Sequence, residues 1–295
     1  MDNKQVTIDL ADVLELMLDA VCVVDRQGRF VFVSAAFEKM FGYRPDEIIG
    51  KPMVNLVYPK DVDKTLNKVS SIIDGETMPR FENRWVRKDG QVVDVLWSAR
   101  WSEKHQVRIA VAHDITERKQ MEKKLLYAAG HDALTDLPNR TLILDRLQSA
   151  LSLAEREQSS LAVMFIDIDG FKEINDQQGH GIGDKLLQGI AKRLKKSVRK
   201  SDTVGRLGGD EFLLVFNKTH NAKNVQSIAE KLRAVIAKPF EIDGLSLQVF
   251  ASIGVASYPE HGNHPLDLVQ YSDQAMYLAK NNGGDSVVLF SSRDF

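Results

Sequence analysis

The sequence has a single cysteine, Cys22, among its 295 residues. One cysteine excludes an intrachain disulfide, and its scarcity suits a reducing compartment. The longest apolar runs, such as LAVMFI at 161–166, are far shorter than the roughly 20 residues that a membrane-spanning helix needs. The first residues, MDNKQVTIDLADVLELM, are too acidic and too interrupted for a signal peptide. We therefore expect a cytoplasmic protein with no membrane segment.

The sequence also lacks an excess of charge of either sign. It has 39 Lys and Arg against 41 Asp and Glu, a formal net charge of -2 at pH 7. Proteins that bind nucleic acid or membrane surfaces usually have a strong basic bias, so we expect neither partner. The length favours two domains over one.

The first third of the chain has the pattern of a small antiparallel domain. Residues 21–34 predict two strands joined at 26–28, followed by short helices, one longer helix and three strands rich in Val, Trp and Phe. Asp89-Gly90 is a hairpin signal between two of those strands. Residues 10–118 resemble a PAS domain, through DAVCVVDRQGRFVFVSAAFEKMFGY, the RKDG of the hairpin and the final DITERK. The resemblance implies an antiparallel sheet with helices over one face, in a sensory role.

A charged segment follows, which we assign as a signalling linker helix over 118–131. Asp114 and Glu117 have the spacing of a capping box. Apolar residues then recur on one side of the predicted helix, at Met121, Leu125 and 128–129. Two interpretations are open: a solvated spacer, or a two-stranded coiled coil that couples paired domains.

From about residue 132 helices and strands alternate. Helices are predicted at 141–156, 183–200, 222–237 and 265–281, with strands at 161–167, 203–216 and 240–257. This order is typical of an α/β domain with a central sheet. The whole chain is then an α+β protein, with a PAS domain at 1–117, the linker helix at 118–131 and a second domain at 132–295.

Acidic residues follow the strands of this second domain at two places. The apolar strand over 161–167 ends at Asp167, and a hairpin at Gly208-Gly209 brings Asp210 and Glu211 to the edge of the sheet. If these strands are neighbours, Asp167 and Asp210 converge, and converging carboxylates repel unless a cation or a proton lies between them. Oxygen ligands with open positions suit Mg²⁺ bound together with phosphates.

The second domain carries a specific set of motifs. Residues 132–290 resemble the GGDEF domain of diguanylate cyclases, through GGDEF at 208–212, DIDGFKEINDQQGHGIGD at 167–184, DALTDLPNR at 132–140, SIGVA at 252–256 and DQAMYLAK at 273–280. The resemblance implies a palm-like βαββαβ core. It also implies condensation of two GTP molecules into cyclic di-GMP with release of two pyrophosphates, with Mg²⁺ or Mn²⁺ as cofactor.

The resemblance assigns roles to single residues. The metal ligands would be Asp167, Asp210 and the backbone carbonyl of Ile168, and the catalytic residues would be Asp210, Glu211 and Lys172. The substrate-binding residues would be Gly170, Phe171, Lys172 and Lys280 at the phosphates and Asn175 and Asp184 at the guanine. His180 would lie on the base side or be structural; both interpretations stay open.

The same resemblance implies regulation and assembly. Arg199 and Asp202, in RKSD, match the family's inhibitory RxxD site for the product, although a salt bridge at a helix end would explain them equally simply. Each domain would hold one GTP, so two must face each other in a homodimer, formed through the PAS domain and the linker helix. Gly284 stands where the family often has an arginine, and we expect weaker triphosphate binding as a result.

The ligand of the PAS domain stays unknown from sequence. Trp85, Trp97 and Trp101 could line a pocket or simply pack in the core, and a flavin, a small metabolite or no ligand are all open. A catalytically silent nucleotide receptor and a PAS-mediated scaffold are the competing functions. The intact signature at 208–212 disfavours both.

Overall fold

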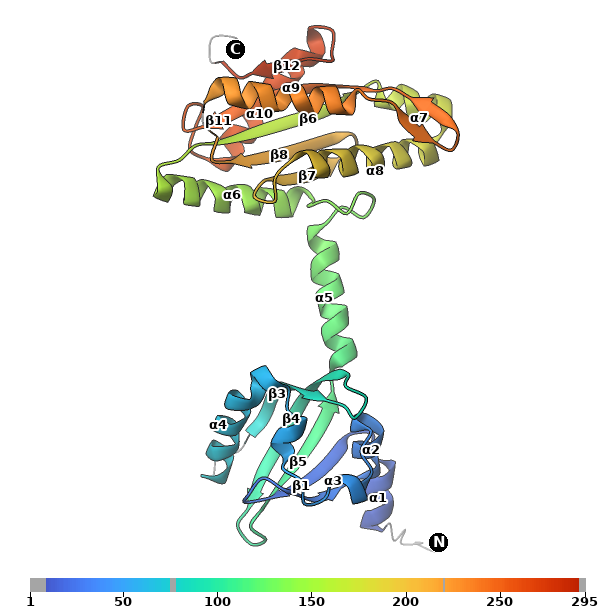
Figure 1. The fold of residues 1–295 in the computed structure, drawn as a ribbon, viewed down its shortest axis with the longest axis vertical. Helices are drawn as coiled ribbons and strands as arrows, with labels where there is room; N and C mark the ends of the chain where they lie inside the picture. The colour runs from blue at the N-terminus through green and yellow to red at the C-terminus, as the bar shows by residue number, and fades with distance from the viewer. Residues whose placement is uncertain (1–8, 75–77, 220, 292–295) are drawn as a thin grey trace, which may run out of the picture. The chain divides into compact units, whose positions relative to one another are not determined.

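The computed structural model describes residues 9–74, 78–219 and 221–291 (Figure 1). The chain divides into two compact units between Lys124 and Leu125. Within the described residues, no helix combines the length and the apolar character that crossing a bilayer requires.

The first unit is built on a five-stranded antiparallel sheet with the strand order β2-β1-β5-β4-β3. Its strands are β1 (Ala20–Asp25), β2 (Phe30–Val33), β3 (Met78–Val86), β4 (Val92–Ser102) and β5 (Val107–Asp114). Buried and more exposed positions alternate along β4 and β5. Since successive side chains of a strand face opposite sides, this alternation shows that one face of the sheet carries the core. The predicted PAS-like sheet is confirmed.

Short helices cover that face. They are α1 (Leu10–Leu16), α2 (Ala35–Phe41), α3 (Pro45–Ile48), the 3₁₀ turns η1 (Met53–Leu56) and η2 (Pro59–Asp61), and α4 (Val62–Ile73). Ser34 begins α2 by accepting a hydrogen bond from the backbone N–H of Phe37. Helix α1 ends at Leu16, and Ala20 already belongs to β1, where it pairs with Ala112 of β5.

Aromatic rings fill the centre of this core. Trp85 and Trp97 contact each other with centroids 4.7 Å apart, and Phe41 lies 5.2 Å from Trp85. Both tryptophans are buried and also line a cavity, so the two interpretations of these residues are not exclusive. Trp101 is partly buried against the same cluster.

The second unit has its own five-stranded sheet, with the order β12-β11-β6-β8-β7. Its strands are β6 (Leu161–Asp169), β7 (Thr203–Gly208), β8 (Glu211–Asn217), β11 (Phe250–Tyr258) and β12 (Val287–Leu289). All neighbours are antiparallel except β11 and β12. A separate hairpin consists of β9 (Phe240–Ile242) and β10 (Leu245–Leu247).

Helices cover both faces of this sheet (Figure 1). They are α6 (Arg140–Glu157), α7 (Phe171–Gln178), α8 (His180–Ser197), α9 (Ala222–Ile236) and α10 (Pro265–Asn281). Strand β6 is buried on both sides: Val163 packs in the cluster with Leu147 of α6, and Met164 in the cluster with Ile190 of α8. This explains its continuous apolar sequence. The order β6, α7–α8, β7, β8, α9, β11 is the predicted βαββαβ core.

Helix α5 (Thr116–Gly130) contains the predicted linker segment and has no buried residue. Met121 and Leu125 are 53% and 70% exposed. The predicted capping box is not formed. The Asp114 carboxylate instead accepts the backbone N–H of Thr116 and pairs with Arg87, a local contact that holds the first turn in another way.

Candidate active site

The signature hairpin places its acids at the edge of the second sheet. Gly209 and Asp210 form the two-residue turn between β7 and β8, and Gly209 has a φ of +51°. The turn thus lies one residue later than the predicted Gly208-Gly209, because the β7–β8 register shifts between Arg206 and Gly208. Asp210 therefore lies in the turn itself, and Glu211 is the first residue of β8.

The two acidic strand ends meet as expected. Strands β6 and β8 are paired neighbours, with Asp167 directly opposite Glu211. Helix α10 contributes a cation, because the Nζ of Lys280 lies 2.7 Å from Oδ1 of Asp167. Asp167 is only 7% exposed, so this pair lies at a nearly buried position.

The negative charge of the acids at this edge is only partly balanced by nearby positive charge. Burial raises the pKa of Asp167, and the charges of Asp210 and Asp169 raise it further, against the opposing effect of Lys280. Burial also raises the pKa of Glu211, to which the charges of Asp167 and Asp273 add. Carboxylates whose ionised form is disfavoured in this way favour a bound cation or a proton.

The donor set fits a hard divalent cation. Asp167 and Asp210 supply carboxylate oxygens, and Ile168, between Asp167 and Asp169 on β6, supplies a backbone carbonyl. Across the described residues, no three His, Cys, Asp or Glu side chains gather as a metal cluster. Mg²⁺ typically binds one or two carboxylates and fills its other positions with water and substrate phosphates, so two acids beside an anion site suit it.

The turn predicted to bind phosphate follows directly after β6. Gly170 has a φ of +70° and turns the chain into α7, whose first residues are Phe171 and Lys172. The first backbone N–H groups of a helix have no partner within the helix and favour phosphate oxygens. Lys172 is exposed on this turn, so its charge is available there.

The residues predicted at the guanine lie where α7 meets α8. The Asn175 side chain of α7 packs on Gly183 of α8 so closely that a Cβ at Gly183 would lie 1.9 Å from Oδ1 of Asn175. Asp184, the next residue, is exposed. The contact brings the two predicted base-binding side chains to one junction. His180 is the exposed first residue of α8.

Hydrogen bonds from Arg206, which were not predicted from the sequence, hold the signature turn in place. Arg206 of β7 donates from Nε and Nη2 to the Gly209 carbonyl, at 2.9 and 2.7 Å. Its Nη1 donates to the Asp132 carboxylate at 2.9 Å, which also accepts from the backbone and hydroxyl of Thr135. The DALTDLPNR motif thus fixes the hairpin that carries Asp210. The sequence feature that could have indicated this contact is the arginine two residues before Gly208.

Asp169 has a structural position beside the site. Its carboxylate accepts from the Ser252 hydroxyl at 2.7 Å and from the Asp285 backbone N–H at 2.8 Å. A Cβ at Gly284 would lie 2.9 Å from that carboxylate, and Gly284 has a φ of +76°. At position 284, where the family often has an arginine, the loop therefore favours glycine, because it lies close against the Asp169 carboxylate.

Two more charged residues face Glu211 and were also missed. Asp273 of α10 raises the pKa of Glu211, and Arg140, the first residue of α6, lowers it. Burial raises the pKa of Asp273, which the Arg140 charge opposes. Neither could be placed here before the sheet and its two helices were assembled.

The RKSD segment forms a turn in which Arg199 and Asp202 do not make a salt bridge with each other. The Asp202 carboxylate accepts the backbone N–H of Arg199 at 3.1 Å, and the Arg199 side chain is exposed without an ion pair among the described residues. Both residues border an open cleft of about 530 Å³, whose rim also carries Arg146, Lys195 and Lys200. The salt-bridge interpretation is therefore not what the structure shows.

Comparison with known proteins gives the same two parts. Residues 9–115 match the family described as PAS fold, and residues 129–286 match the family described as diguanylate cyclase, GGDEF domain. The bifunctional diguanylate cyclase/cyclic di-GMP phosphodiesterase MucR of Pseudomonas aeruginosa is 42% identical over 177 residues, 60% of this chain and 26% of that protein. A diguanylate cyclase of Vibrio cholerae is 29% identical over 301 residues, 98% of this chain and 91% of that protein.

The solved structures agree with these matches. The GGDEF domain of TpbB from Pseudomonas aeruginosa superposes with a TM-score of 0.54 at 42% identity, covering 56% of this chain and 96% of that one. The chain spans 26–38% of the length of the first curated relatives it matches, MucR and TpbB. Since the GGDEF match covers more than half of the 295 residues, the chain belongs to the GGDEF-domain family of diguanylate cyclases, with a PAS domain preceding the GGDEF domain.

Proposed function

We propose that this protein is a sensory diguanylate cyclase, which condenses two GTP molecules into cyclic di-GMP and two pyrophosphates. The observation that carries the proposal is the intact signature turn, with Asp210 close enough to the buried Asp167 for its charge to raise the pKa of that acid. The strand that carries Asp167 leads directly through Gly170 into α7. We propose the PAS domain at 1–117, the linker at 118–131 and the catalytic domain at 132–295 as the working division of the chain.

The residues divide the work of holding one GTP. The backbone N–H groups at 170–171 bind phosphate oxygens, and Lys172 and Lys280 add positive charge. Asn175 and Asp184 accept and donate at the guanine edge, where the N1 and N2 hydrogens distinguish it from adenine. His180 remains a candidate on the base side.

The reaction is phosphoryl transfer at the α-phosphate. Asp210 takes the proton of the ribose 3′-hydroxyl, whose oxygen forms the new bond to phosphorus while the bond to pyrophosphate breaks. The same exchange occurs again in the opposite direction, which closes the ring. Asp167, Asp210 and the Ile168 carbonyl would hold Mg²⁺ or Mn²⁺, which supplies Lewis-acid stabilisation of the phosphate charge. Glu211 lies next to this set, opposite Asp167, and would add a further carboxylate to it.

Two domains are needed, because each presents one GTP and the attacking hydroxyl belongs to the partner's substrate. We propose a homodimer formed through the PAS domain and α5, whose exposed Met121 and Leu125 support a paired rather than a spacer helix. Signal reception by the PAS domain would alter how the two catalytic domains meet.

We further propose that cyclic di-GMP inhibits the enzyme at Arg199 and Asp202. The exposed, unpaired guanidinium of Arg199 and the basic rim of the neighbouring cleft suit a dianionic dinucleotide that carries guanine edges. The Asp202 carboxylate is already engaged by backbone N–H groups, and its remaining acceptor sites would face the base.

The test is chromatography of the purified full chain incubated with GTP, with and without Mg²⁺. Formation of cyclic di-GMP that requires the metal is the expected result. Bound GTP without product, in the presence of Mg²⁺ and Mn²⁺ in turn, would favour the silent receptor. Failure to bind GTP would favour the PAS scaffold.

A further inference from the structure

The core of the PAS domain contains a cavity beside a cation. The cavity is small: the centres of water-sized molecules can occupy about 30 Å³ of it, more than the roughly 10–15 Å³ that a single water needs. Its walls come from α4, η1 and the sheet. Small side chains make the room on the sheet side, where Cys22, Ala99 and Ala110 stand in place of larger residues.

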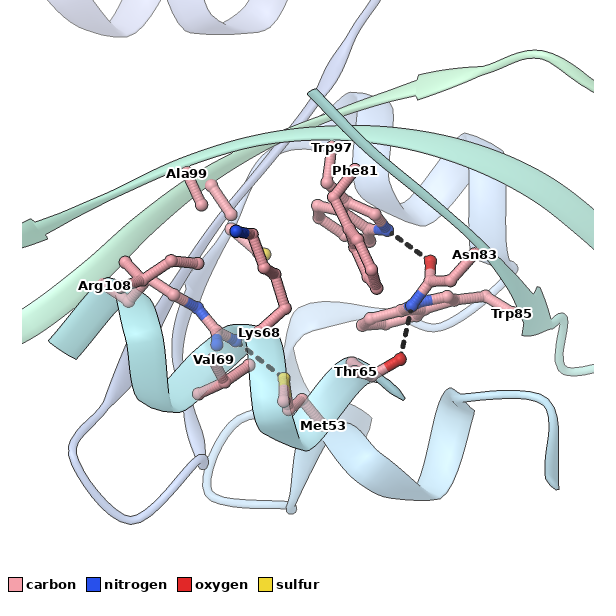
Figure 2. Close-up of a pocket in the computed structure, with 13 residues that line it drawn as sticks. Met53, Thr65, Lys68, Val69, Phe81, Asn83, Trp85, Trp97, Ala99 and Arg108 are labelled. Carbon is pink, nitrogen blue, oxygen red and sulfur yellow. Dashed lines mark hydrogen bonds between the residues drawn. The ribbon is translucent and has the colours of Figure 1, made fainter. Parts of the chain in front are cut away.

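Arg108 lines this cavity from β5. It is 7% exposed and shares the core-facing side of β5 with Ala110 and Ala112. Its Nη2 lies 2.7 Å from the sulfur of Met53, a weak acceptor that carries no charge. Figure 2 shows the guanidinium turned towards Met53 at the wall of the cavity.

No protein group balances this charge in the part of the chain that the structure describes. Arg108 makes no ion pair there, and the one titratable group that acts on it is the Cys22 thiol. Burial raises the pKa of that thiol to about 12, so it is uncharged at neutral pH. A buried, uncompensated guanidinium is unfavourable, and an anion brought from outside would remove the penalty.

A second polar group in the same cavity is also without a partner. The indole Nε1 of Trp85 is buried and has no hydrogen-bond acceptor among the residues that the structure describes. By contrast, the Nε1 of Trp97 donates to Asn83, whose amide donates to Thr65. Figure 2 shows this chain of hydrogen bonds on the tryptophan side of the cavity and Arg108, with Lys68, on the other side.

We propose that the PAS cavity binds a small monocarboxylate with an apolar body. The carboxylate pairs with the Arg108 guanidinium, and the apolar part lies among Trp85, Trp97, Phe81 and Ile72. A guanidinium matches a carboxylate in a two-bond fork, which explains arginine at a position where β5 otherwise carries alanine.

The test compares acids with their uncharged amides on the purified full chain. The probes are benzoate and hexanoate, each against its amide, with binding followed by tryptophan fluorescence and by melting temperature. At least one acid should bind at least about tenfold more tightly than its amide. Equal binding of acid and amide in both pairs would overturn the proposal, as would a lack of binding by both acids in the millimolar range.

Variants assign the effect to Arg108. Arg108→Met should remove the preference for acid over amide while leaving amide binding unchanged, and Arg108→Gln gives the same test if the first variant does not fold. Arg100→Met is the matched control, because Arg100 is exposed on β4 of the same sheet. A retained acid preference in the Arg108 variant, or its loss in the control, would overturn the proposal. Without probe, Arg108→Met should melt above the wild type; a lower melting temperature would mean that Arg108 already has a partner.

Discussion

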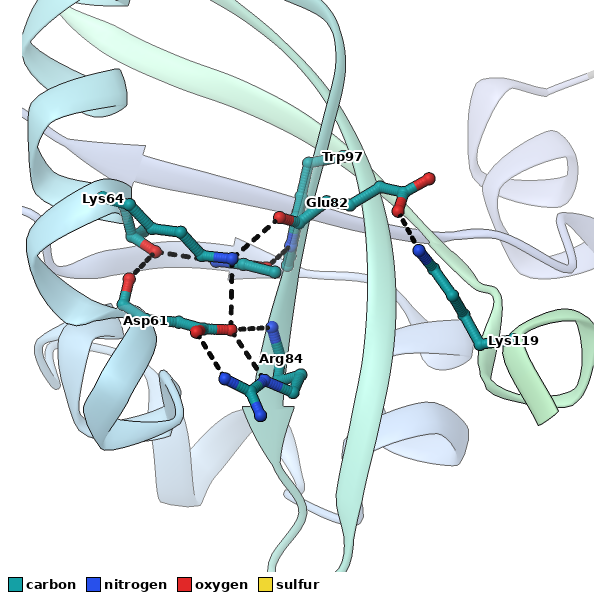
Figure 3. Close-up of polar contacts among 8 residues, drawn as sticks. Asp61, Lys64, Glu82, Arg84, Trp97 and Lys119 are labelled. Atoms are coloured by element: carbon teal, nitrogen blue, oxygen red, sulfur yellow. Dashed lines mark hydrogen bonds and ion pairs between the residues drawn. The ribbon is translucent and has the colours of Figure 1, made fainter. Parts of the chain in front are cut away.

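The two units treat a buried carboxylate in opposite ways. In the PAS unit, Asp61 accepts from the Arg84 backbone and guanidinium at 2.7–3.0 Å, with Lys64 3.4 Å away (Figure 3). These partners hold the pKa of Asp61 far below its usual range, led by the Arg84 hydrogen bonds. In the GGDEF unit, burial and neighbouring acids raise the pKa of Asp167 although Lys280 contacts it.

The difference distinguishes a carboxylate with a structural role, Asp61, from a carboxylate in the candidate active site, Asp167. Asp61 finds its hydrogen-bond donors and positive charges within the PAS unit, and its contacts connect η2 to β3. Asp167 is only partly compensated, because the chain gathers further acids around it instead of further cations. A carboxylate that the protein itself leaves under-compensated indicates that the missing charge comes from a ligand.

The largest effect that this comparison predicts is on catalysis. Asp210→Ala should lower cyclic di-GMP synthesis by at least about a thousandfold, because both the metal ligand and the proton acceptor are lost. The melting temperature should not fall, since Asp210 lies in a hairpin turn, only partly buried and next to other acids. Asp145→Asn, an exposed acid of α6, is the matched control. Product assays with equal amounts of folded protein decide it; synthesis at the wild-type rate would remove Asp210 from its role.

Cations extend the comparison, because Arg84 is paired and Arg199 is not. Arg199→Ala should weaken inhibition by cyclic di-GMP by about tenfold or more, since charge-assisted bidentate contacts are lost. Synthesis without added product should keep its rate. Initial rates over a series of product concentrations measure the effect, with Lys192→Ala as an exposed control on α8. Unchanged inhibition would show that RKSD is only a turn.

For the satisfied acid, the expected effect is on stability. Asp61→Asn should lower the melting temperature of the PAS unit by about 5 °C or more at neutral pH. Because the folded pKa is depressed, the stabilisation is present above the ordinary carboxyl range and is lost as the pH falls through and below it. The gap between wild type and variant should therefore close in acid. Scanning calorimetry across pH checks it, with Asp74→Asn at the exposed end of α4 as control.

The smallest effect has the opposite sign and concerns Glu211. Its folded pKa is raised, so its ionised form costs stability above that pKa and costs nothing below the ordinary range. Glu211→Gln should raise the melting temperature of metal-free protein by about 1–2 °C at neutral pH and not in acid. Thermal scans in chelator test this directly. Destabilisation at neutral pH would mean that the acids already have partners in the metal-free protein.

The sequence predicted much of the second unit because its pattern is local. The continuous apolar run of β6 and the glycines of the hairpin act over a few residues. The predicted helix at 265–281 and the pairing of the two acidic strand ends are confirmed. The turn was misplaced by one residue, because a register shift between β7 and β8 depends on the pairing of both strands.

The family, the order of helices and strands, and the acids of the candidate site could all be predicted from the sequence, since these depend on local pattern and motif spacing. The tertiary structure decided which charges are satisfied. Arg206 reaches Asp132 across 74 positions, Lys280 reaches Asp167 across 113, and Arg108 lies in a cavity without an acid among the described residues. Whether a charge is paired depends on residues brought together from distant segments and on the water they exclude, and neither can be inferred from a local sequence pattern.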